Sequence, residues 1–417
     1  MTVYQSFRQY LLLRVKPLSF GDDSMIIREH YMTQIRPFYE SDLIKIITGI
    51  RRCGKSVILR QIMSEIEKTG KRCLFLDFDL RPVSAGIPDA DALIAYVNEY
   101  LGNDKLYVFL DEIQNVEGWN EAVRTLRLYN TSVFITGSNS KLLSREYTKV
   151  LSGRYVSFRI RPFVYREAKE YANQMGRAFE ISDYLIWGGF PAALEQPDDE
   201  ARKRYLNDLN DTIVYNDLEN RYNIRKKDIF ERIVDFILVS NARIFSAKSI
   251  ADYMKGQNIP VSVPTVIKYL GYLREAYVID DIPLYSPKAK AKLNYYYKLF
   301  DEDVSFNSIR VSGNRFDLTH NLENIILNEL IYMGYEVTVY QNKGREIDFR
   351  AVRDGKIYLV QVAYSVAEDK TYEKEFSAFA DIDNTIKKII ITNDDIDYST
   401  STVYHYKLRD FLTMENL

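Results

Sequence analysis

The stretch Gly49–Ser56 reads GIRRCGKS and decides how the rest of the chain can be interpreted. It matches the pattern G-x-x-x-x-G-K-[ST], in which two glycines let successive backbone amides turn around a phosphate group. The lysine of the pattern, Lys55, reaches the β- and γ-phosphates of a nucleotide, and the hydroxyl of Ser56 binds Mg²⁺. The residues that we expect to contact a nucleotide are Gly49, Ile50, Arg51, Arg52, Cys53, Gly54, Lys55, Ser56 and Val57.

The residues on either side of this loop support that interpretation. Leu43–Thr48 is an apolar run of strand length, and Ile58, Leu59, Ile62 and Ile66 recur at helical spacing after the loop. A strand, a loop and a helix in this order place the positive end of a helix dipole at the phosphate site. The alternative is a glycine-containing turn in another kind of α/β protein, and the flanking elements count against it.

A later hydrophobic strand, Leu106–Leu110, ends in the acidic pair Asp111 and Glu112. An acidic pair at a strand end is usually a solvated edge, but after a phosphate loop it is typical of nucleotide hydrolysis. We expect Asp111 to hold Mg²⁺ and Glu112 to activate the attacking water as a general base.

Two further segments add polar residues to the same region. The strand Ser132–Thr136 leads to Ser138 and Asn139, either of which could sense the γ-phosphate or the attacking water. A polar turn is the alternative for each of them. Arg154 precedes a fifth strand and could stabilise transition-state charge on a neighbouring subunit's γ-phosphate, which would require a homo-oligomer. A surface salt bridge is the alternative role for Arg154.

These motifs resemble the AAA-type ATPase family of prokaryotes, whose members carry a second module of unknown function at the C-terminus. The resemblance rests on Gly49–Ser56, Leu110–Glu112, Thr136–Ser138, Leu151–Arg154, Arg161–Phe163, Glu167 and the Gly-Gly-Phe-Pro turn within Tyr184–Pro191. It implies ATP as the nucleotide. The strand between the phosphate loop and the acidic pair implies the additional-strand class of P-loop ATPases, an α/β fold with a parallel sheet flanked by helices.

The middle of the chain indicates a lid and then a winged helix. The spacing of apolar residues predicts a largely helical connector over 181–223, followed by helices over 229–239, 246–254 and 263–276. Two strands, Tyr277–Ile282 and Tyr295–Phe300, would then form a β-wing. Three helices and a β-wing are the winged-helix version of a helix-turn-helix.

Charge favours double-stranded DNA as a partner of this region. Residues 226–300 contain 12 Lys and Arg against 7 Asp and Glu, whereas the whole chain has a net charge of −2. A basic loop beside a recognition helix suits phosphate contacts. The alternative is a winged helix that serves only as a hinge between proteins. The expected DNA contacts are Lys268, Arg274, Lys288, Lys290 and Lys292.

The C-terminal segment follows the pattern of the restriction-endonuclease-like fold, with a helix that carries Glu323 and a strand that carries Asp348. In such nucleases carboxylates gather Mg²⁺ and a lysine of an acid-x-Lys strand assists catalysis. Here that strand reads Gln361-Val362-Ala363, so an amide replaces the acid and a methyl replaces the lysine. We therefore interpret Glu323, Asp348 and Gln361 as a vestigial nuclease site, in a fold retained for DNA or partner binding rather than for cleavage.

The bulk properties exclude other classes of protein. Hydrophobic residues make up 46% of the 417 residues and charged residues 27%, which is ordinary for a globular protein. The 2 Cys and 3 His exclude a disulfide framework and a Cys- or His-rich metal site. The sequence has no apolar run long enough to span a membrane, and the expected location is cytoplasmic. Met25 is an alternative start of translation.

The predicted domains are an N-terminal extension (1–24), an ATPase core (25–178), a helical lid or connector (179–225), a winged helix (226–303) and a degenerate endonuclease-like domain (304–417). The favoured function is Mg²⁺-dependent ATP hydrolysis that couples nucleotide state to DNA or partner engagement. The alternatives are an ATP-regulated DNA nuclease and a nucleotide-gated interaction protein that does not bind DNA.

Overall fold

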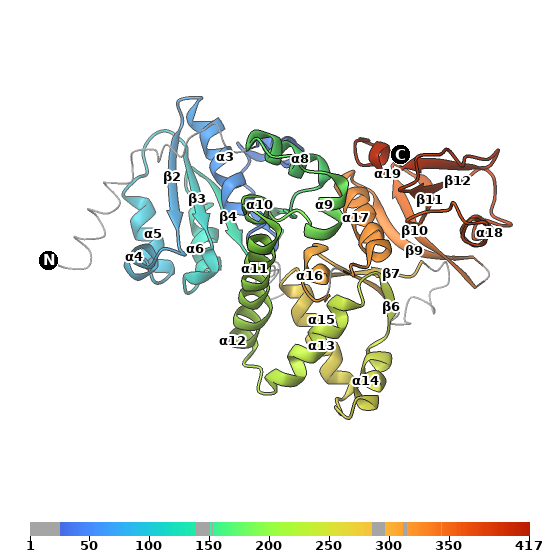
Figure 1. Ribbon diagram of the computed structural model, residues 1–417. Coiled ribbons are helices and arrows are strands. Elements are labelled where there is room, and N and C mark those ends of the chain that lie inside the picture. The colour runs from blue at the N-terminus through green and yellow to red at the C-terminus, as the bar shows by residue number, and fades with distance from the viewer. Residues whose placement is uncertain (1–25, 139–150, 152, 286–296, 312–314, 343) are drawn as a thin grey trace. The chain divides into compact units, whose positions relative to one another are not determined.

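The computed structural model describes residues 26–138, 151, 153–285, 297–311, 315–342 and 344–417, and these residues are coloured in Figure 1. The chain divides into two compact units, Met1–Arg161 and Pro162–Leu417.

The first unit is built on a parallel sheet of five strands in the order β2-β3-β4-β1-β5. Its strands are β1 (Ile44–Thr48), β2 (Arg72–Asp77), β3 (Leu106–Asp111), β4 (Thr131–Gly137) and β5 (Tyr155–Arg159). Every residue of β1, β3 and β4 is buried, as expected for parallel strands covered on both faces. The strand β4 lies between β1 and β3, so the predicted parallel sheet with an additional strand is confirmed.

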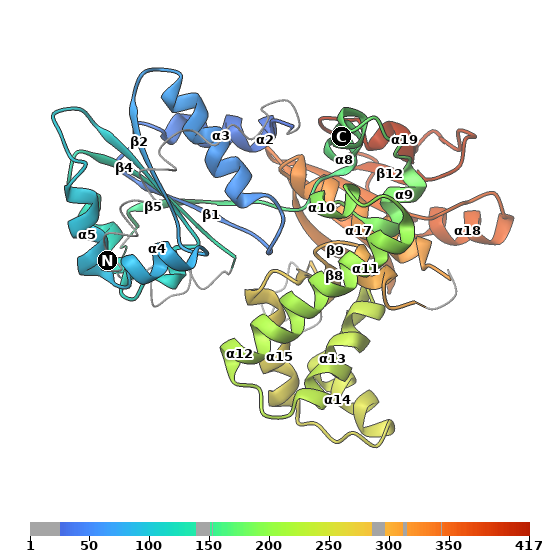
Figure 2. The ribbon, with the colours of Figure 1, turned by 60° about the vertical axis from the view of Figure 1, so that its left-hand side comes forward.

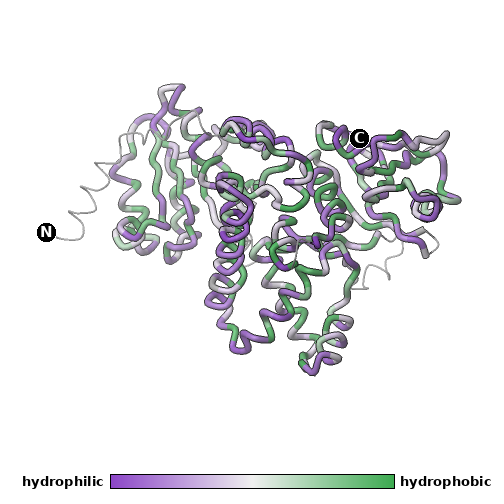
Figure 3. The backbone as a smooth tube through the Cα atoms, in the orientation of Figure 1, coloured by the Kyte–Doolittle hydropathy of each residue, from purple (hydrophilic) through white to green (hydrophobic). Residues whose placement is uncertain are grey.

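Helices cover both faces of this sheet (Figure 2). The helix after the phosphate loop, α3 (Lys55–Glu67), packs on one face with α2 (Glu29–Ile35) and η1 (Arg36–Phe38). The other face and its helices form one apolar cluster that includes Ile46, Leu76 and Val108. These helices and turns are α4 (Arg81–Gly86), α5 (Ala90–Asn98), η2 (Ile113–Asn115) and α6 (Trp119–Leu126). Figure 3 shows the hydrophobic colour that runs along the central strands.

The second unit begins with α8 (Tyr165–Gln174), which falls within the predicted ATPase core. The helical segment predicted over 181–223 follows as α9 (Ile181–Trp187), α10 (Pro191–Leu194), α11 (Asp199–Asn210), the π-helix η4 (Asp211–Asp217) and α12 (Leu218–Tyr222).

Three helices and a small sheet follow, in agreement with the predicted elements. They are α13 (Lys227–Val239), β6 (Arg243–Phe245), α14 (Ala247–Gly256), α15 (Val263–Glu275), β7 (Ile279–Pro283) and β8 (Tyr297–Asp301). Side chains of Ser246 and Ser262 cap α14 and α15, as predicted. The sheet is antiparallel with the order β6-β8-β7, and the short strand β6 was not predicted.

The C-terminal part of the second unit is a second five-stranded sheet in the order β13-β12-β11-β10-β9. The strands from β9 to β11 are antiparallel, whereas β12 and β13 run parallel to β11. The elements are α16 (Ser305–Ser308), α17 (Leu318–Tyr332), β9 (Glu336–Asn342), β10 (Arg345–Arg353), β11 (Lys356–Val362), α18 (Asp369–Ser377), β12 (Lys387–Thr392), β13 (Val403–Lys407) and α19 (Leu408–Phe411).

The Gly-Gly-Phe-Pro turn explains why the division between the units precedes the predicted core boundary at residue 178. A Cβ on Gly188 would lie 1.8 Å from Asp303 Oδ1, and one on Gly189 would lie 1.9 Å from Phe163 O. The backbone N–H of Gly189 donates to Asp303 Oδ2 at 2.7 Å, and that of Phe163 donates to Gly189 O at 2.8 Å. These bonds attach the segment 162–178, with α8, to the second unit.

Candidate functional site

The phosphate loop connects β1 to α3 and depends on its glycines. Gly49 has φ +143°, and a Cβ there would lie 2.0 Å from the carbonyl oxygen of Ile160. Gly54 has φ +102° and begins α3 without a side-chain cap from the described residues. The first N–H groups of a helix have no intrahelical acceptor, so an uncapped helix start can bind an anion. Ile50 and Cys53 are buried, and the Cys53 thiol donates to Ile160 O at 3.3 Å, in the interior.

Lys55 occupies the first turn of α3 and is 4% exposed. Its Nζ donates to the backbone oxygen of Ile50 at 3.1 Å and lies 3.8 Å from Glu112 Oε1. Of these two contacts, only the one with Ile50 O is within hydrogen-bonding distance of the ammonium. The loop residues that follow the turn are less buried: Arg52, with φ +66°, is exposed, and Arg51, Ser56 and Val57 are partly buried.

The two expected metal ligands are neighbours. Ser56 and Thr136 both donate side-chain hydrogen bonds to Asp111, which ends β3 and is 2% exposed. Burial raises the pKa of Asp111 to about 6, and the hydrogen bonds from Thr136 and Ser56 limit that rise. A hydroxyl and a carboxylate are ligands that suit Mg²⁺. The residue set therefore fits a Mg²⁺-nucleotide complex at the start of α3.

Glu112 follows Asp111 in a left-handed conformation, with φ +51°. Such a φ is uncommon for a residue other than glycine and needs support from its surroundings. The backbone N–H of Glu112 donates to Thr136 Oγ1 at 2.9 Å, and that of Ser138 donates to Glu112 Oε2 at 3.3 Å. Gln114 donates to the same carboxylate oxygen. The end of β4 thus fixes Glu112, and Ser138 acts through its backbone.

Arg154 lies at the opposite end of the strands from the phosphate loop. It precedes β5, and its backbone oxygen accepts a hydrogen bond from Ile44 N at the beginning of β1, whereas the phosphate loop follows the end of β1. Arg154 is exposed. Five strand residues span about 16 Å, so its side chain cannot serve its own phosphate loop. Any role as an arginine finger requires a second copy of the chain. Asn139 lies outside the described residues.

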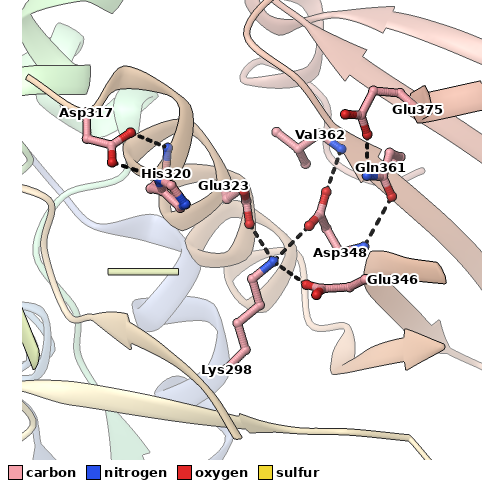
Figure 4. Close-up of polar contacts among 9 residues, drawn as sticks. All are labelled: Lys298, Asp317, His320, Glu323, Glu346, Asp348, Gln361, Val362 and Glu375. Carbon is pink, nitrogen blue, oxygen red and sulfur yellow. Dashed lines mark hydrogen bonds and ion pairs between the residues drawn. The ribbon is translucent and has the colours of Figure 1, made fainter. Parts of the chain in front are cut away.

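The second cluster of predicted residues lies in the C-terminal part of the second unit (Figure 4). Glu323 on α17 and Asp348 on β10 come together, but around a lysine, Lys298 of β8. The Nζ of Lys298 is 2.6 Å from Glu323 Oε2 and 2.8 Å from Asp348 Oδ1. It is also 2.8 Å from Oε1 of Glu346 on β10.

Gln361 lies on the far side of Asp348 from Lys298 (Figure 4). Its Oε1 accepts from the backbone N–H of Asp348 at 3.3 Å, and its Nε2 donates to Glu375 Oε2 at 2.6 Å. The backbone N–H of Val362 donates to Asp348 Oδ2 at 2.9 Å. The side-chain amide of Gln361 therefore links the backbone of β10 at Asp348 to Glu375 on α18.

The expected DNA contacts are placed unequally. Lys268 is exposed on α15, beside exposed Ile267. Arg274 forms an ion pair with Asp281 at 2.9 Å and lies over the ring of Tyr297, so its charge is partly engaged within the chain. Lys288, Lys290 and Lys292 lie outside the described residues.

Sequence reasoning missed three residues of these sites. Arg28 is 2% exposed and donates from Nη1 to Cys53 O at 3.1 Å and to Arg161 O at 2.9 Å, which braces the phosphate loop. Thr136 joins Asp111 to the backbone of Glu112. Lys298 had one detectable signal, because a lysine within the apolar strand Tyr297–Asp301 must find a partner for its charge. For Arg28 the sequence gives no signal that we recognise.

Comparison with known proteins identifies relatives along most of the chain. Residues 41–169 match the family described as AAA domain, and residues 178–310 match the family described as Domain of unknown function (DUF8612). An uncharacterized protein of Haemophilus influenzae is 33% identical over 381 residues, which cover 88% of this chain and 94% of that protein. An uncharacterized protein of Methanocaldococcus jannaschii is 30% identical over 375 residues, covering 84% and 82%.

Solved structures resemble the chain more distantly. A Walker-type ATPase of Pyrococcus abyssi has a TM-score of 0.49 and 18% identity, covering 70% of this chain and 97% of that one. The Orc1 protein of Aeropyrum pernix, solved in complex with DNA, has a TM-score of 0.30 and 13% identity, covering 70% and 94%. Likenesses at this level say nothing about the activity of this chain.

No helix among the described residues has the length and apolarity needed to cross a bilayer. The phosphate loop, the acidic pair at the end of β3 and the strand order agree with the family match over 41–169. The chain belongs, with the Haemophilus and Methanocaldococcus proteins, to a family of P-loop AAA-type ATPases that carry a domain of unknown function after the AAA domain.

Proposed function

We propose that this protein binds ATP with Mg²⁺, hydrolyses it, and uses its nucleotide state to control how the second unit engages double-stranded DNA or a protein partner. The observation that carries the proposal is the meeting of Ser56, Asp111, Glu112 and Thr136 beside the start of α3. A site that only bound nucleotide would not need a supported carboxylate such as Glu112.

Each residue has a role that follows from its position. The backbone amides at the start of α3 and the ammonium of Lys55 bind the phosphates, and Ser56 and Asp111 hold Mg²⁺. The metal neutralises charge on the β- and γ-phosphates. Glu112 accepts the proton of the attacking water, and Thr136 keeps Glu112 and Asp111 in position. Arg154 supplies positive charge to the site of a neighbouring copy.

The region 226–303 is proposed to be a winged helix that binds DNA. The element order α13-β6-α14-α15-β7-β8 and the antiparallel order β6-β8-β7 support this proposal. The net charge of residues 226–300 and the exposed Lys268 on α15 favour a phosphate-bearing partner. A protein partner at the same helix is the competing outcome.

The C-terminal part is proposed to be an endonuclease-like fold that does not cut DNA. The order of α17, the antiparallel strands β9 to β11, α18 and the parallel strand β12 supports the fold. The ion pairs of Lys298 with Glu323 and Asp348 count against an ATP-regulated nuclease, because a cation already occupies the carboxylates.

The test is an ATPase assay on the wild type, Lys55→Ala and Glu112→Gln, with and without duplex DNA. We expect wild-type turnover that DNA stimulates, and loss of turnover in both variants. Wild-type protein that binds ATP without turnover would contradict hydrolysis, and turnover indifferent to DNA would favour a protein partner. End-labelled DNA in the same reactions should stay intact, and cleavage that Asp348→Ala abolishes would establish the nuclease instead.

A further inference from the structure

The Lys298 ammonium is surrounded by three carboxylates from two other elements. Glu323 belongs to α17, and Glu346 and Asp348 belong to β10, with Nζ–oxygen distances of 2.6 to 2.8 Å (Figure 4). An ammonium group has three N–H donors and no acceptor. Its Nζ donates hydrogen bonds to Glu346 Oε1 and Asp348 Oδ1 and forms an ion pair with Glu323 Oε2, so three carboxylates engage its charge.

Burial makes this charge pairing obligatory. Lys298 is 3% exposed, and the side chains of Glu323 and Asp348 are 10% and 8% exposed. Burial acts to lower the pKa of Lys298, but the charges of Asp348, Glu323 and Glu346 outweigh it and raise that pKa well above its usual value. The ammonium thus stays charged. Burial also raises the pKa of Glu323, with a further rise from the charge of Asp348.

Asp348 and Gln361 make further hydrogen bonds within the chain. The second oxygen of Asp348 accepts from Val362 N–H at 2.9 Å. Gln361 joins the backbone of Asp348 to Glu375. Asp348 is consequently held in place by a bond from β11 that does not depend on Lys298.

We propose that the Lys298 ammonium is a built-in cation that fills the position of a divalent metal ion among Glu323, Glu346 and Asp348 and keeps it closed to metals. Carboxylate oxygens are ligands that suit Mg²⁺ and Mn²⁺. In the described residues of the wild type, no group of three or more His, Cys, Asp or Glu is arranged to hold a metal. Removal of the ammonium should open such a site.

The same ammonium links the two sheets of the second unit. Lys298 lies on β8, the central strand of the three-stranded sheet, and its partners Glu346 and Asp348 lie on β10. A second connection lies nearby, where Tyr285 N–H donates to Val339 O on β9 at 2.7 Å. The built-in cation therefore joins the proposed winged helix to the endonuclease-like sheet without a metal. This inference rests on these contacts and does not depend on ATP hydrolysis.

The test measures the thermal unfolding midpoint of the full chain, free of nucleotide and pretreated with chelator, with and without Mn²⁺. The variant is Lys298→Met, which keeps the apolar stem of the side chain and removes its charged end. The control is Lys388→Met on β12, because Lys388 is also 3% exposed but donates to the neutral acceptors Ile382 O and Asn384 Oδ1, each at 2.8 Å. Any Mn²⁺ bound at the phosphate loop shifts all three proteins equally.

We expect both variants to unfold at lower temperature than the wild type. Mn²⁺ should raise the midpoint of Lys298→Met by more than about 2 °C beyond any shift in the wild type and in Lys388→Met, because a ligand of the native state stabilises it. Equal Mn²⁺ shifts in all three proteins would overturn the proposal. A wild-type shift that Asp348→Asn abolishes would also overturn it, since the site would then already accept metal.

A second variant keeps the test decisive if Lys298→Met does not fold. The double variant Lys298→Met/Glu346→Gln removes one negative charge together with the positive one, and Glu346, at 36% side-chain exposure, is the most accessible of the three acids. Glu323 and Asp348 remain as ligands, so Mn²⁺ should still raise its midpoint relative to Glu346→Gln alone. If Mn²⁺ shifts the midpoints of both proteins equally, the proposal that Lys298 fills a metal position is wrong.

Discussion

Lys55 and Lys298 are both nearly buried beside carboxylates, but the chain engages them differently. The Nζ of Lys55 donates to one backbone oxygen and remains 3.8 Å from Glu112, whereas that of Lys298 is within 2.8 Å of three carboxylates. Among the contacts with described residues, Lys55 keeps donors that can turn to a phosphate, whereas three carboxylates enclose the ammonium of Lys298. Acidic residues grouped in a fold therefore indicate a ligand site only where the chain does not supply its own cation.

The largest expected effect separates the two sets of carboxylates by their chemistry. Glu112→Gln removes the proposed general base, so ATP turnover should fall by roughly 10²- to 10⁴-fold. ATP binding should persist, because Lys55 and the backbone amides are unchanged. Glu323→Gln makes the same chemical change in the other cluster and should leave turnover within about twofold. Steady-state ATPase rates measure turnover, and ATP titrations measure binding. Equal losses of turnover in the two variants would mean that the two sets of carboxylates do not differ in their role in hydrolysis.

The second prediction compares the two lysines by stability. Removal of one partner from a buried ion pair costs about 3–5 kcal/mol, because charges stay buried without compensation. We expect the free energy of unfolding of Lys298→Met to be lower than that of the wild type by this amount. For Lys55→Met we expect about 1 kcal/mol, the contribution of one hydrogen bond. Urea unfolding of the nucleotide-free wild type and both variants gives their free energies of unfolding. A larger loss of stability in Lys55→Met than in Lys298→Met would contradict the prediction.

The sequence predicts the framework of the first region because its motif is local. The pattern Gly49–Ser56, the strand before it and the acidic pair after β3 predict the sheet edge where Lys55, Ser56, Asp111 and Glu112 belong. The positions of glycines carry this information, since Gly49 is required by its approach to Ile160 O. By contrast, the bracing of the loop by Arg28 depends on contacts with residues 25 and 133 positions further along the chain, which no local pattern records.

The second region was only half predictable. The convergence of Glu323 and Asp348 follows from the endonuclease-like pattern, and the structure brings them to one ammonium. Their partner comes from β8, in a segment interpreted as part of another domain, so the missing lysine of the acid-x-Lys strand does not point to Lys298. The segment 363–417 carried no motif, and α18, β12, β13 and α19 were not predicted from it.

The third prediction concerns pH at the nucleotide site. The raised pKa of Asp111, about 6, means that its carboxyl is protonated below that pH and ionised above it. Since only the ionised form holds Mg²⁺, ATP turnover should fall as pH drops through about 6. Thr136→Ala removes a hydrogen bond that lowers this pKa, so the acidic limb should move to higher pH. Higher Mg²⁺ should move it back, because metal and proton compete for the carboxylate.

The pH–rate profile of kcat/KM for the wild type and Thr136→Ala measures this displacement. In our proposal Thr136 is not a metal ligand. A general structural effect of Thr136→Ala would therefore lower the rate at every pH without moving the acidic limb of the profile. A limb at the same pH in both proteins would contradict the role of Thr136 as a support of Asp111.

The smallest expected effect tests the proposed winged helix. Lys268→Ala removes one exposed charge from α15, so binding to duplex DNA should weaken several-fold for all sequences alike. The slope of log K against log salt should decrease by about 1, because one fewer counterion is released. Lys370→Ala on α18 removes another exposed charge, outside the three-helix region, and should change neither quantity. If both substitutions weaken binding equally, DNA is held by the charge of the surface in general, and α15 loses its special role.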